Sequence, residues 1–228
     1  MKKYECDQGT CLMCVSCVSD WLPAVSAHKT NMPIKKGQQI FTEGEEVKHI
    51  YFVYSGKVKV HKRWDAEKEL IIRFAQPGGI LGHMGLGKDP VYPVTATAIE
   101  PTVICAIELS FFESTLNVNP KFTYTLMKLF ADELQESEKR MRNLVHMPVK
   151  ERIAMAMLNL KKQFGVDDNG AINIELTRQD LSSFAAVSYE TLFKVTNDFV
   201  QSGLIEANGK NLKILNEQAL IALTTVVS

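Results

Sequence analysis

Cysteines near the start of the chain have a spacing that suits metal binding or thiol chemistry. Cys11, Cys14 and Cys17 are separated by two residues each, Cys6 lies five residues before Cys11, and the fifth cysteine is Cys105. Gaps of two residues allow neighbouring sulfurs to converge on one centre. Cys6, Cys11, Cys14 and Cys17 could together bind zinc tetrahedrally, and Cys105 could be a small buried hydrophobe. From the residues alone, a metal site, a disulfide set and a tail of idle thiols all remain open.

A phosphate-binding loop is the other candidate for chemistry. Residues 82–89 nearly match the P-loop, but the last position, which must offer a hydroxyl to Mg²⁺, is Asp89. Pro90 then follows where a helix should begin. We therefore do not expect an enzyme.

The composition is that of a globular protein with two domains. The chain has 228 residues, of which 46% are apolar and 23% charged, and its formal net charge is zero. This length suffices for two domains with a buried core each. The neutral balance means that a contact with nucleic acid needs a local patch. No run reaches the roughly eighteen apolar residues that span a bilayer, and Glu5 and Asp7 interrupt a signal-like start. We expect a cytoplasmic protein with reduced thiols and no membrane partner.

Residues 34–107 are predicted to form short antiparallel strands. Apolar or alternating runs occur at 50–54, 57–61 and 69–74, and glycines such as Gly56 separate them. Short strands between glycine and proline turns are typical of a small sandwich or barrel. We expect an antiparallel β-roll, similar to a jelly roll.

A long amphipathic helix is predicted over 121–146. Its apolar residues recur mostly every three or four positions, which gives one narrow apolar stripe. A stripe of this width fits a coiled-coil-like pairing with an identical helix; packing on its own domain is the alternative. The predicted dimer contacts are Leu126, Phe130, Leu134, Met141 and Leu144. Pro148 marks a break before a second helix over 150–164.

The last third of the chain contains a helix-turn-helix pattern. Thr177 and Asp180 form a capping box at the start of a short helix that ends near Phe184. Ser188 is the N-cap of a second helix, which continues through Val200. The connection between them has about three residues, with alanine where such motifs often have glycine.

A turn, a strand and a hairpin surround these helices. The turn is predicted at 167–170, the strand at 172–176, and the hairpin over 204–215 with its turn at Asn208-Gly209. A helix-turn-helix followed by a hairpin is a winged helix.

The second helix of this motif is the predicted DNA-reading element. In a helix-turn-helix it enters the major groove with its N-terminal residues near base edges. Glu190 can accept from cytosine, Lys194 can donate to guanine or phosphate, and other polar residues can hold the DNA backbone. The predicted DNA contacts are Arg178, Ser188, Tyr189, Glu190, Thr191, Lys194, Lys210 and Lys213. From residue 150 onward there are eight lysines and arginines against nine acids, so a protein-interaction module is the alternative.

Residues 34–215 resemble the CRP/FNR family of transcription regulators. The matching segments are 34–38, 41–45, 54–59, 78–86, 176–180, 188–191 and 203–205. The resemblance implies an α+β protein with an antiparallel β-roll of the cyclic-nucleotide-binding type, a long dimerisation helix and a C-terminal winged helix-turn-helix. The expected parts are a cysteine-rich segment (1–33), a β-roll sensor domain (34–119), the dimerisation helix (120–147) and a winged-helix domain (148–228). It also implies a homodimer that binds double-stranded DNA and contacts RNA polymerase.

The effector site departs from that of the cAMP-binding members of the family. Those members carry a glutamate for the ribose and an Arg-Ser pair for the phosphate, where this chain has His83 and residues 92–95. No arginine occurs in the sequence between 73 and 140, so a bidentate phosphate clamp has no donor. We do not expect cAMP to bind. A regulator that senses an unidentified small ligand in the β-roll is the alternative, with the pocket candidates His83, Tyr92 and Thr95.

The oxygen-sensing FNR branch of the family implies one use for the cysteines. Its members hold a [4Fe-4S] cluster with three closely spaced N-terminal cysteines and one distant cysteine in the β-roll. By this resemblance the ligands are Cys11, Cys14, Cys17 and Cys105, with Cys6 as an alternative, and the signal is oxygen or redox state. The last gap of the N-terminal set is shorter here than in FNR. Zinc, thiol redox sensing and no bound centre stay open.

Overall fold

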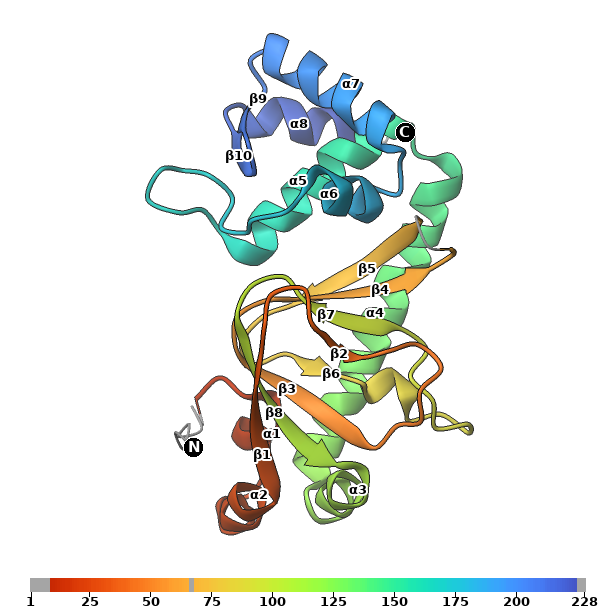
Figure 1. The fold of residues 1–228 in the computed structure, drawn as a ribbon, viewed down its shortest axis with the longest axis vertical. Helices are drawn as coiled ribbons and strands as arrows, with labels where there is room; N and C mark the ends of the chain where they lie inside the picture. The colour runs from red at the N-terminus through yellow and green to blue at the C-terminus, as the bar shows by residue number, and fades with distance from the viewer. Residues whose placement is uncertain (1–8, 66–67, 225–228) are drawn as a thin grey trace. The chain divides into compact units, whose positions relative to one another are not determined.

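Two four-stranded sheets form most of the first half of the protein in the computed structural model, which describes residues 9–65 and 68–224. One sheet has the strand order β1-β8-β3-β6 and the other β2-β7-β4-β5 (Figure 1). Strand β8 pairs antiparallel with β1 and β3, and β7 pairs antiparallel with β2 and β4. The predicted antiparallel β-roll is therefore confirmed. The strands are β1 (Lys29–Ile34), β2 (Gln39–Phe41), β3 (His49–Ser55), β4 (Val58–Arg63), β5 (Glu69–Ala75), β6 (Ile80–Leu81), β7 (Thr95–Ala98) and β8 (Thr102–Glu108).

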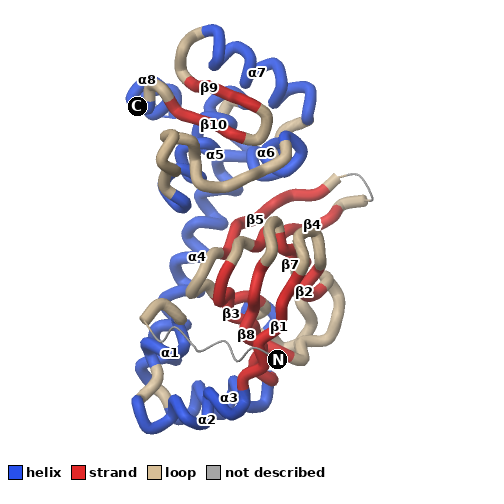
Figure 2. Tube along the Cα trace, turned by 60° about the vertical axis from the view of Figure 1, so that its left-hand side comes forward, coloured by secondary structure: helices blue, strands red, loops and turns tan. Residues whose placement is uncertain are grey.

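The chain divides into two compact units. The first contains residues 1–63 and 72–135, and the second contains 64–71 and 136–228. Strands predominate in the first unit and helices in the second (Figure 2). The first unit also contains α1 (Leu12–Ser16), η1 (Ser19–Trp21), α2 (Leu22–His28), η2 (His83–Gly85) and α3 (Leu109–Val118). The sequence patterns did not predict α1, α2 or α3, and β1 carries the β-roll into the segment 1–33.

The sheet that contains β8 has one face covered by helices. Cys105 of β8 lies opposite Phe52 of β3, and opposite residues in an antiparallel pair share a face. The ring of Phe52 contacts Phe112 of α3, which contacts Phe122 of the next helix, with ring centroids 6.5 and 5.8 Å apart. Tyr51 points to the other face and stacks on Phe41 of the second sheet. Cys105 therefore belongs to the layer between the sheet and the helices.

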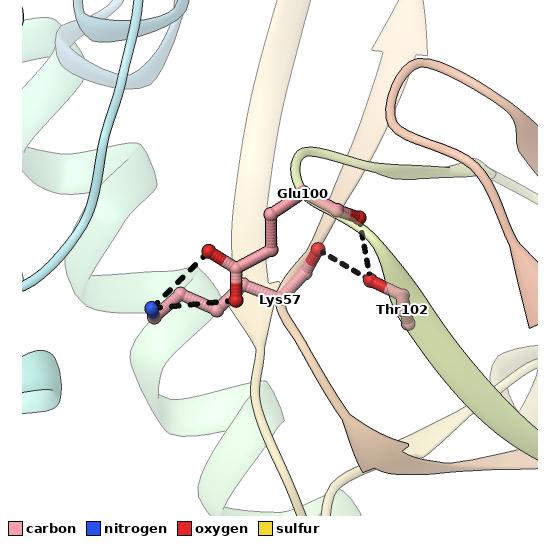
Figure 3. A network of polar contacts seen from close by, with 3 residues as sticks. All are labelled: Lys57, Glu100 and Thr102. Atoms are coloured by element: carbon pink, nitrogen blue, oxygen red, sulfur yellow. Dashed lines mark hydrogen bonds and ion pairs between the residues drawn. The ribbon is translucent and has the colours of Figure 1, made fainter.

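A polar network fastens the turn between β7 and β8 to the start of β4 (Figure 3). The ammonium group of Lys57 lies 3.4 Å from both carboxylate oxygens of Glu100. The hydroxyl of Thr102 donates to the carbonyl of Glu100 at 2.9 Å. Gly56, the residue before Lys57, has a φ of 86°, and a Cβ at this position would collide with Thr102. Glycine is therefore required at position 56.

Helices form most of the second unit. The long helix α4 spans Pro120–His146, with residues in both units, and α5 follows over Val149–Phe164. The winged helix consists of α6 (Arg178–Ala185), α7 (Tyr189–Gln201), β9 (Ile205–Asn208), β10 (Asn211–Ile214) and α8 (Glu217–Thr224). The predicted long helix and winged helix are confirmed. No helix within the described residues is long and apolar enough to cross a membrane.

Two local predictions in the winged helix are wrong. Residues 172–176 do not form a strand: Ile172 makes an isolated bridge with Val166 and donates its N–H to Leu212 at 2.8 Å. These residues form an extended segment, and their burial alternates because one side of the segment packs on the core. In the described part of the chain, the segment has no neighbouring strand that pairs with it along its length. The hairpin turns at Gly209-Lys210 rather than at Asn208-Gly209, because Asn208 pairs with Asn211.

Candidate nucleic-acid interface and cysteine site

The first helix of the helix-turn-helix, α6, is fixed by hydrogen bonds at its start. The hydroxyl of Thr177 accepts from the N–H of Asp180 at 3.0 Å, and the Asp180 carboxylate accepts from the N–H of Thr177 at 3.3 Å. The predicted capping box therefore forms with aspartate in the fourth position. The helix ends at Ala185, and the next residue, Ala186, has a left-handed φ of 54°. This residue turns the chain toward α7 at a position that favours glycine.

The start of α7 presents polar and aromatic side chains to solvent. Ser188 caps the helix, its hydroxyl accepting from the N–H of Thr191 at 3.2 Å. Tyr189, Glu190 and Lys194 are exposed. The backbone N–H of Glu190, the Ser188 hydroxyl and Lys194 together hold the pKa of the Glu190 carboxyl below its usual value. Glu190 is thus an ionised acceptor at neutral pH.

The remaining predicted DNA contacts lie on the same unit. Arg178 begins α6 and is half-buried, whereas Lys210 is exposed at the hairpin turn. Both side chains line a small pocket whose floor includes Ile174 and Leu181, so the wing and the start of α6 are neighbours. Lys213 lies on β10 and is half-buried.

The four described cysteines lie around one hydrophobic core. Cys14 and Cys105 are each 6% exposed and belong to this core, and Cys11 and Cys17 pack against it. Burial, with a contribution from Cys11, raises the pKa of the Cys17 thiol to about 11. Cys6 lies outside the described residues.

The number and chemistry of these sulfurs fit a thiolate-bound centre. Among the described residues, however, no three His, Cys, Asp or Glu side chains are grouped so that they could hold a metal ion. The donors thus share a core without forming an assembled cage.

The three pocket candidates are buried, and each has a protein partner. The Tyr92 hydroxyl donates to the carbonyl of His49 at 2.7 Å, and the Thr95 hydroxyl accepts from the N–H of Glu43 at 3.0 Å. His83 Nε2 lies 2.9 Å from Oε2 of Glu133. The hydroxyls of Tyr92 and Thr95 and Nε2 of His83 are therefore used in protein contacts, whereas Nδ1 of His83 is buried without a hydrogen-bond partner among the described residues.

The predicted dimer contacts on α4 divide into two groups. Leu126 is 4% exposed and packs in the core of its own unit, so this residue is a wrong assignment. Phe130, Leu134 and Met141 are exposed, by 37%, 61% and 58%, and Leu144 is half-buried. Sequence reasoning missed Met127, which is 58% exposed. The seven-residue spacing of Met127, Leu134 and Met141 is the sequence signal that could have identified Met127 as a dimer-contact candidate.

Sequence reasoning also missed a contact that joins the cysteine segment to the start of α4. Asn119, 1% exposed, accepts from the backbone N–H of Val18 at 2.8 Å and donates to the carbonyl of Thr115 at 2.9 Å. Trp21 donates its ring N–H to the Thr115 hydroxyl at 3.1 Å. These bonds attach the segment after Cys17 to α3 and to the residue that precedes α4.

Comparison with known proteins agrees with this architecture. The cyclic nucleotide-binding domain family matches residues 32–119, and the Crp-like helix-turn-helix domain family matches residues 151–223. The transcriptional activator protein Anr of Pseudomonas aeruginosa is 30% identical over 197 residues, which cover 86% of this chain and 80% of that protein. The fumarate and nitrate reduction regulatory protein of Salmonella typhimurium is 27% identical over 193 residues, or 84% of this chain and 77% of that protein.

Solved structures share the fold. The structure of FixK2 from Bradyrhizobium japonicum superimposes with a TM-score of 0.77 at 22% identity, covering 88% of this chain and 99% of FixK2. The chain belongs to the CRP/FNR family of DNA-binding transcriptional regulators.

Proposed function

We propose that this protein is a cytoplasmic homodimer that binds a specific double-stranded DNA sequence and responds to oxygen or redox state through its cysteines. By family resemblance, RNA polymerase is its expected protein partner.

The exposed start of α7 carries the DNA-reading part of the proposal. α7 is the second helix of the Crp-like helix-turn-helix, and its Tyr189, Glu190 and Lys194 are exposed at its N-terminal end. Such residues face base edges when the helix lies in the major groove. Ionised Glu190 can accept from a cytosine amino group, and Lys194 can donate to guanine or phosphate.

Four residues are proposed to hold the DNA backbone. Phosphate contacts fix the register of a protein on the duplex without reading sequence. Arg178 and Lys210 support this role because they are neighbours at one pocket. The proposed backbone contacts are Arg178, Ser188, Lys210 and Lys213, whereas Thr191 is proposed to lie near base edges with the other residues at the start of α7.

Exposed apolar residues on α4 support the homodimer. Met127, Leu134 and Met141 follow each other at intervals of seven, and all are more than half exposed. Phe130 lies between the first two and is 37% exposed. A heptad of this kind forms a seam between two parallel helices and buries side chains that water otherwise surrounds.

Four cysteines on one core support the redox signal. We assign Cys11, Cys14, Cys17 and Cys105 as the residues that hold a [4Fe-4S] cluster, which needs four thiolates. When bound, such a cluster supplies oxygen-sensitive redox chemistry. The chain's own part is to bring α1 and β8 to the same core.

Asn119 provides a path from the cysteine segment to the dimerisation helix. Its side chain binds the backbone of Val18, one residue after Cys17, and its carbonyl accepts from the N–H of Thr123 in α4 at 3.0 Å. A displacement of Val18 would break its bond to Asn119, the residue that precedes α4. Regulation through this path requires that the energy of the contact between Val18 and Asn119 differs between the two conformational states of the protein.

DNA selection with and without oxygen tests the proposal. Protein purified without oxygen is used to enrich a pool of random duplexes, and affinity for the enriched duplex is then measured before and after exposure to air. We expect an inverted repeat whose half-sites are centred about 10 base pairs apart or a multiple of this. We also expect air to weaken binding by about tenfold or more, within the usual range of allosteric coupling.

Cysteine variants give the controls for this experiment. Cys105→Ser should bind DNA in the same way with and without air, because the fourth ligand is lost. Cys6→Ser should keep the response of the unchanged protein. Equal affinity of the unchanged protein under both conditions would contradict the redox signal, and failure to enrich any sequence would contradict specific DNA binding.

A further inference from the structure

Phe193 is an exposed aromatic residue on the helix proposed to read DNA. Its side chain is 56% exposed, although most phenylalanines of the protein belong to the core. α7 already has a buried face, made by Leu192, Thr196 and Phe199. Phe193 is therefore not needed to anchor the helix.

The helical positions around Phe193 place it beside the polar residues at the start of α7. Residues four apart lie next to each other on a helix surface, so Phe193 neighbours Tyr189, which is 46% exposed. Glu190 and Lys194 form a second pair at the same spacing, and Lys194 lowers the pKa of Glu190. Tyr189 and Phe193 thus form an apolar strip over the first two turns of α7, and Glu190 and Lys194 form a charged strip beside it.

This pairing of strips suits the major groove of DNA better than a protein partner. The core of a protein interface is depleted in charged residues, whereas here a carboxylate and an ammonium group flank the ring. The major groove presents donors, acceptors and the C5 methyl group of thymine next to one another. Phenylalanine can contact that methyl group, while Glu190 and Lys194 reach neighbouring base edges.

We propose that Phe193 is a specificity-determining residue that contacts the C5 methyl group of a thymine in each half-site. The inference rests on the proposed DNA binding and adds to it an apolar readout. Cytosine has a hydrogen at C5 in place of the methyl group and an amino group in place of O4, so it offers the ring no methyl contact. Uracil differs from thymine only by the missing methyl group, which makes it the sharpest probe.

Replacement of thymine by deoxyuridine tests the contact. The duplex enriched by the unchanged protein is synthesised with deoxyuridine in place of one thymine at a time, symmetrically in both half-sites. Loss of one buried methyl group should weaken binding by about fourfold per contact. We expect this penalty at one thymine position per half-site and affinities within about 1.5-fold at thymines outside the reach of α7.

A variant of Phe193 identifies the residue that reads the methyl group. Phe193→Ala should bind the thymine duplex more weakly and should lose the deoxyuridine penalty at the identified position. Val200→Ala is the matched control: Val200 is also exposed on α7, by 43%, but lies two turns further from the N-terminus. It should keep the penalty unchanged. Both positions are exposed and alanine favours helix, so folding is retained.

The outcomes separate this inference from the proposed function. If the selection enriches no sequence, the proposed DNA reading itself is contradicted. An enriched sequence whose deoxyuridine duplexes all bind like the thymine duplex would overturn the role of Phe193 alone. A penalty that persists in Phe193→Ala would overturn it too, because another side chain would then contact the methyl group.

Discussion

His83 and Glu133 form a contact between the β-roll and the long helix α4 within the first unit. His83 Nε2 lies 2.9 Å from Glu133 Oε2, and Arg73 Nε lies 3.3 Å from the other carboxylate oxygen. Burial raises the pKa of Glu133, but the hydrogen bond from His83 and the charges of His83 and Arg73 outweigh it, so that the pKa lies below 4.5. One carboxylate of α4 thus binds two side chains of the β-roll.

Neutralising Glu133 should destabilise the first unit. Glu133→Gln removes a charged acceptor from two buried donors, and we expect a loss of about 1–3 kcal/mol in the free energy of unfolding at pH 7. Urea denaturation monitored by fluorescence measures this loss. Asp132→Asn, at an exposed neighbouring position, is the matched control and should change little.

The same contact predicts a dependence of stability on pH. A carboxyl group whose pKa is lowered by folding stabilises the protein fully above its unfolded pKa, here 4.5, and the contribution is lost as the pH falls through the folded value. The stability difference between the unchanged protein and Glu133→Gln should therefore shrink as the pH falls below about 4.5. A difference that grows on acidification would contradict the assignment.

Asn119 should control the order of the cysteine segment. Asn119→Ala removes the acceptor of the part-buried bond from the Val18 N–H and the donor to the Thr115 carbonyl, two hydrogen bonds worth about 0.5–1.5 kcal/mol each. Hydrogen exchange at Val18 should become faster, whereas Asn117→Ala, at an exposed position on α3, should leave it unchanged. Equal exchange in both variants would mean that the bond does not hold the segment.

A charge in the α4 seam should prevent dimerisation. Leu134 is 61% exposed and occupies the middle of the heptad; in a dimer, Leu134→Glu would bury two unpaired carboxylates near each other. Analytical ultracentrifugation should give a monomer for this variant and a dimer for Val118→Glu, which alters another exposed apolar residue, on α3. Dimers from both variants would place the interface elsewhere.

The left-handed turn at Ala186 should respond to substitution in a defined order. Ala186→Gly removes the Cβ strain of a φ of 54° but adds unfolded-state entropy, so we expect stability equal to or up to about 1 kcal/mol above that of alanine. Ala186→Val should lose about 1–2 kcal/mol, because a β-branched side chain tolerates this conformation least. Thermal unfolding of the two variants measures the order, and a more stable valine variant would contradict it.

Features with short-range determinants were the ones predicted correctly from the sequence. The capping box depends on Thr177 and Asp180, three residues apart, and the long helix depends on a repeat within one element. The strand at 172–176 failed because alternation reports burial on one side but not a ladder partner. His83 and Glu133 are fifty residues apart, and Asn119 and Val18 lie 101 residues apart, so neither contact has a local signal. Leu126 was misassigned because periodicity does not distinguish a helix face that meets its own core from one that meets a partner.

Iron and acid-labile sulfide, measured in protein purified without oxygen, test whether the cysteines hold a [4Fe-4S] cluster. We expect about four of each per chain, with a broad visible absorption band, and their loss in Cys105→Ser but not in Cys6→Ser. Zinc is measured in the same samples. Protein without iron, or a Cys105→Ser variant that retains its iron and sulfide, would contradict the cluster and the redox signal built on it.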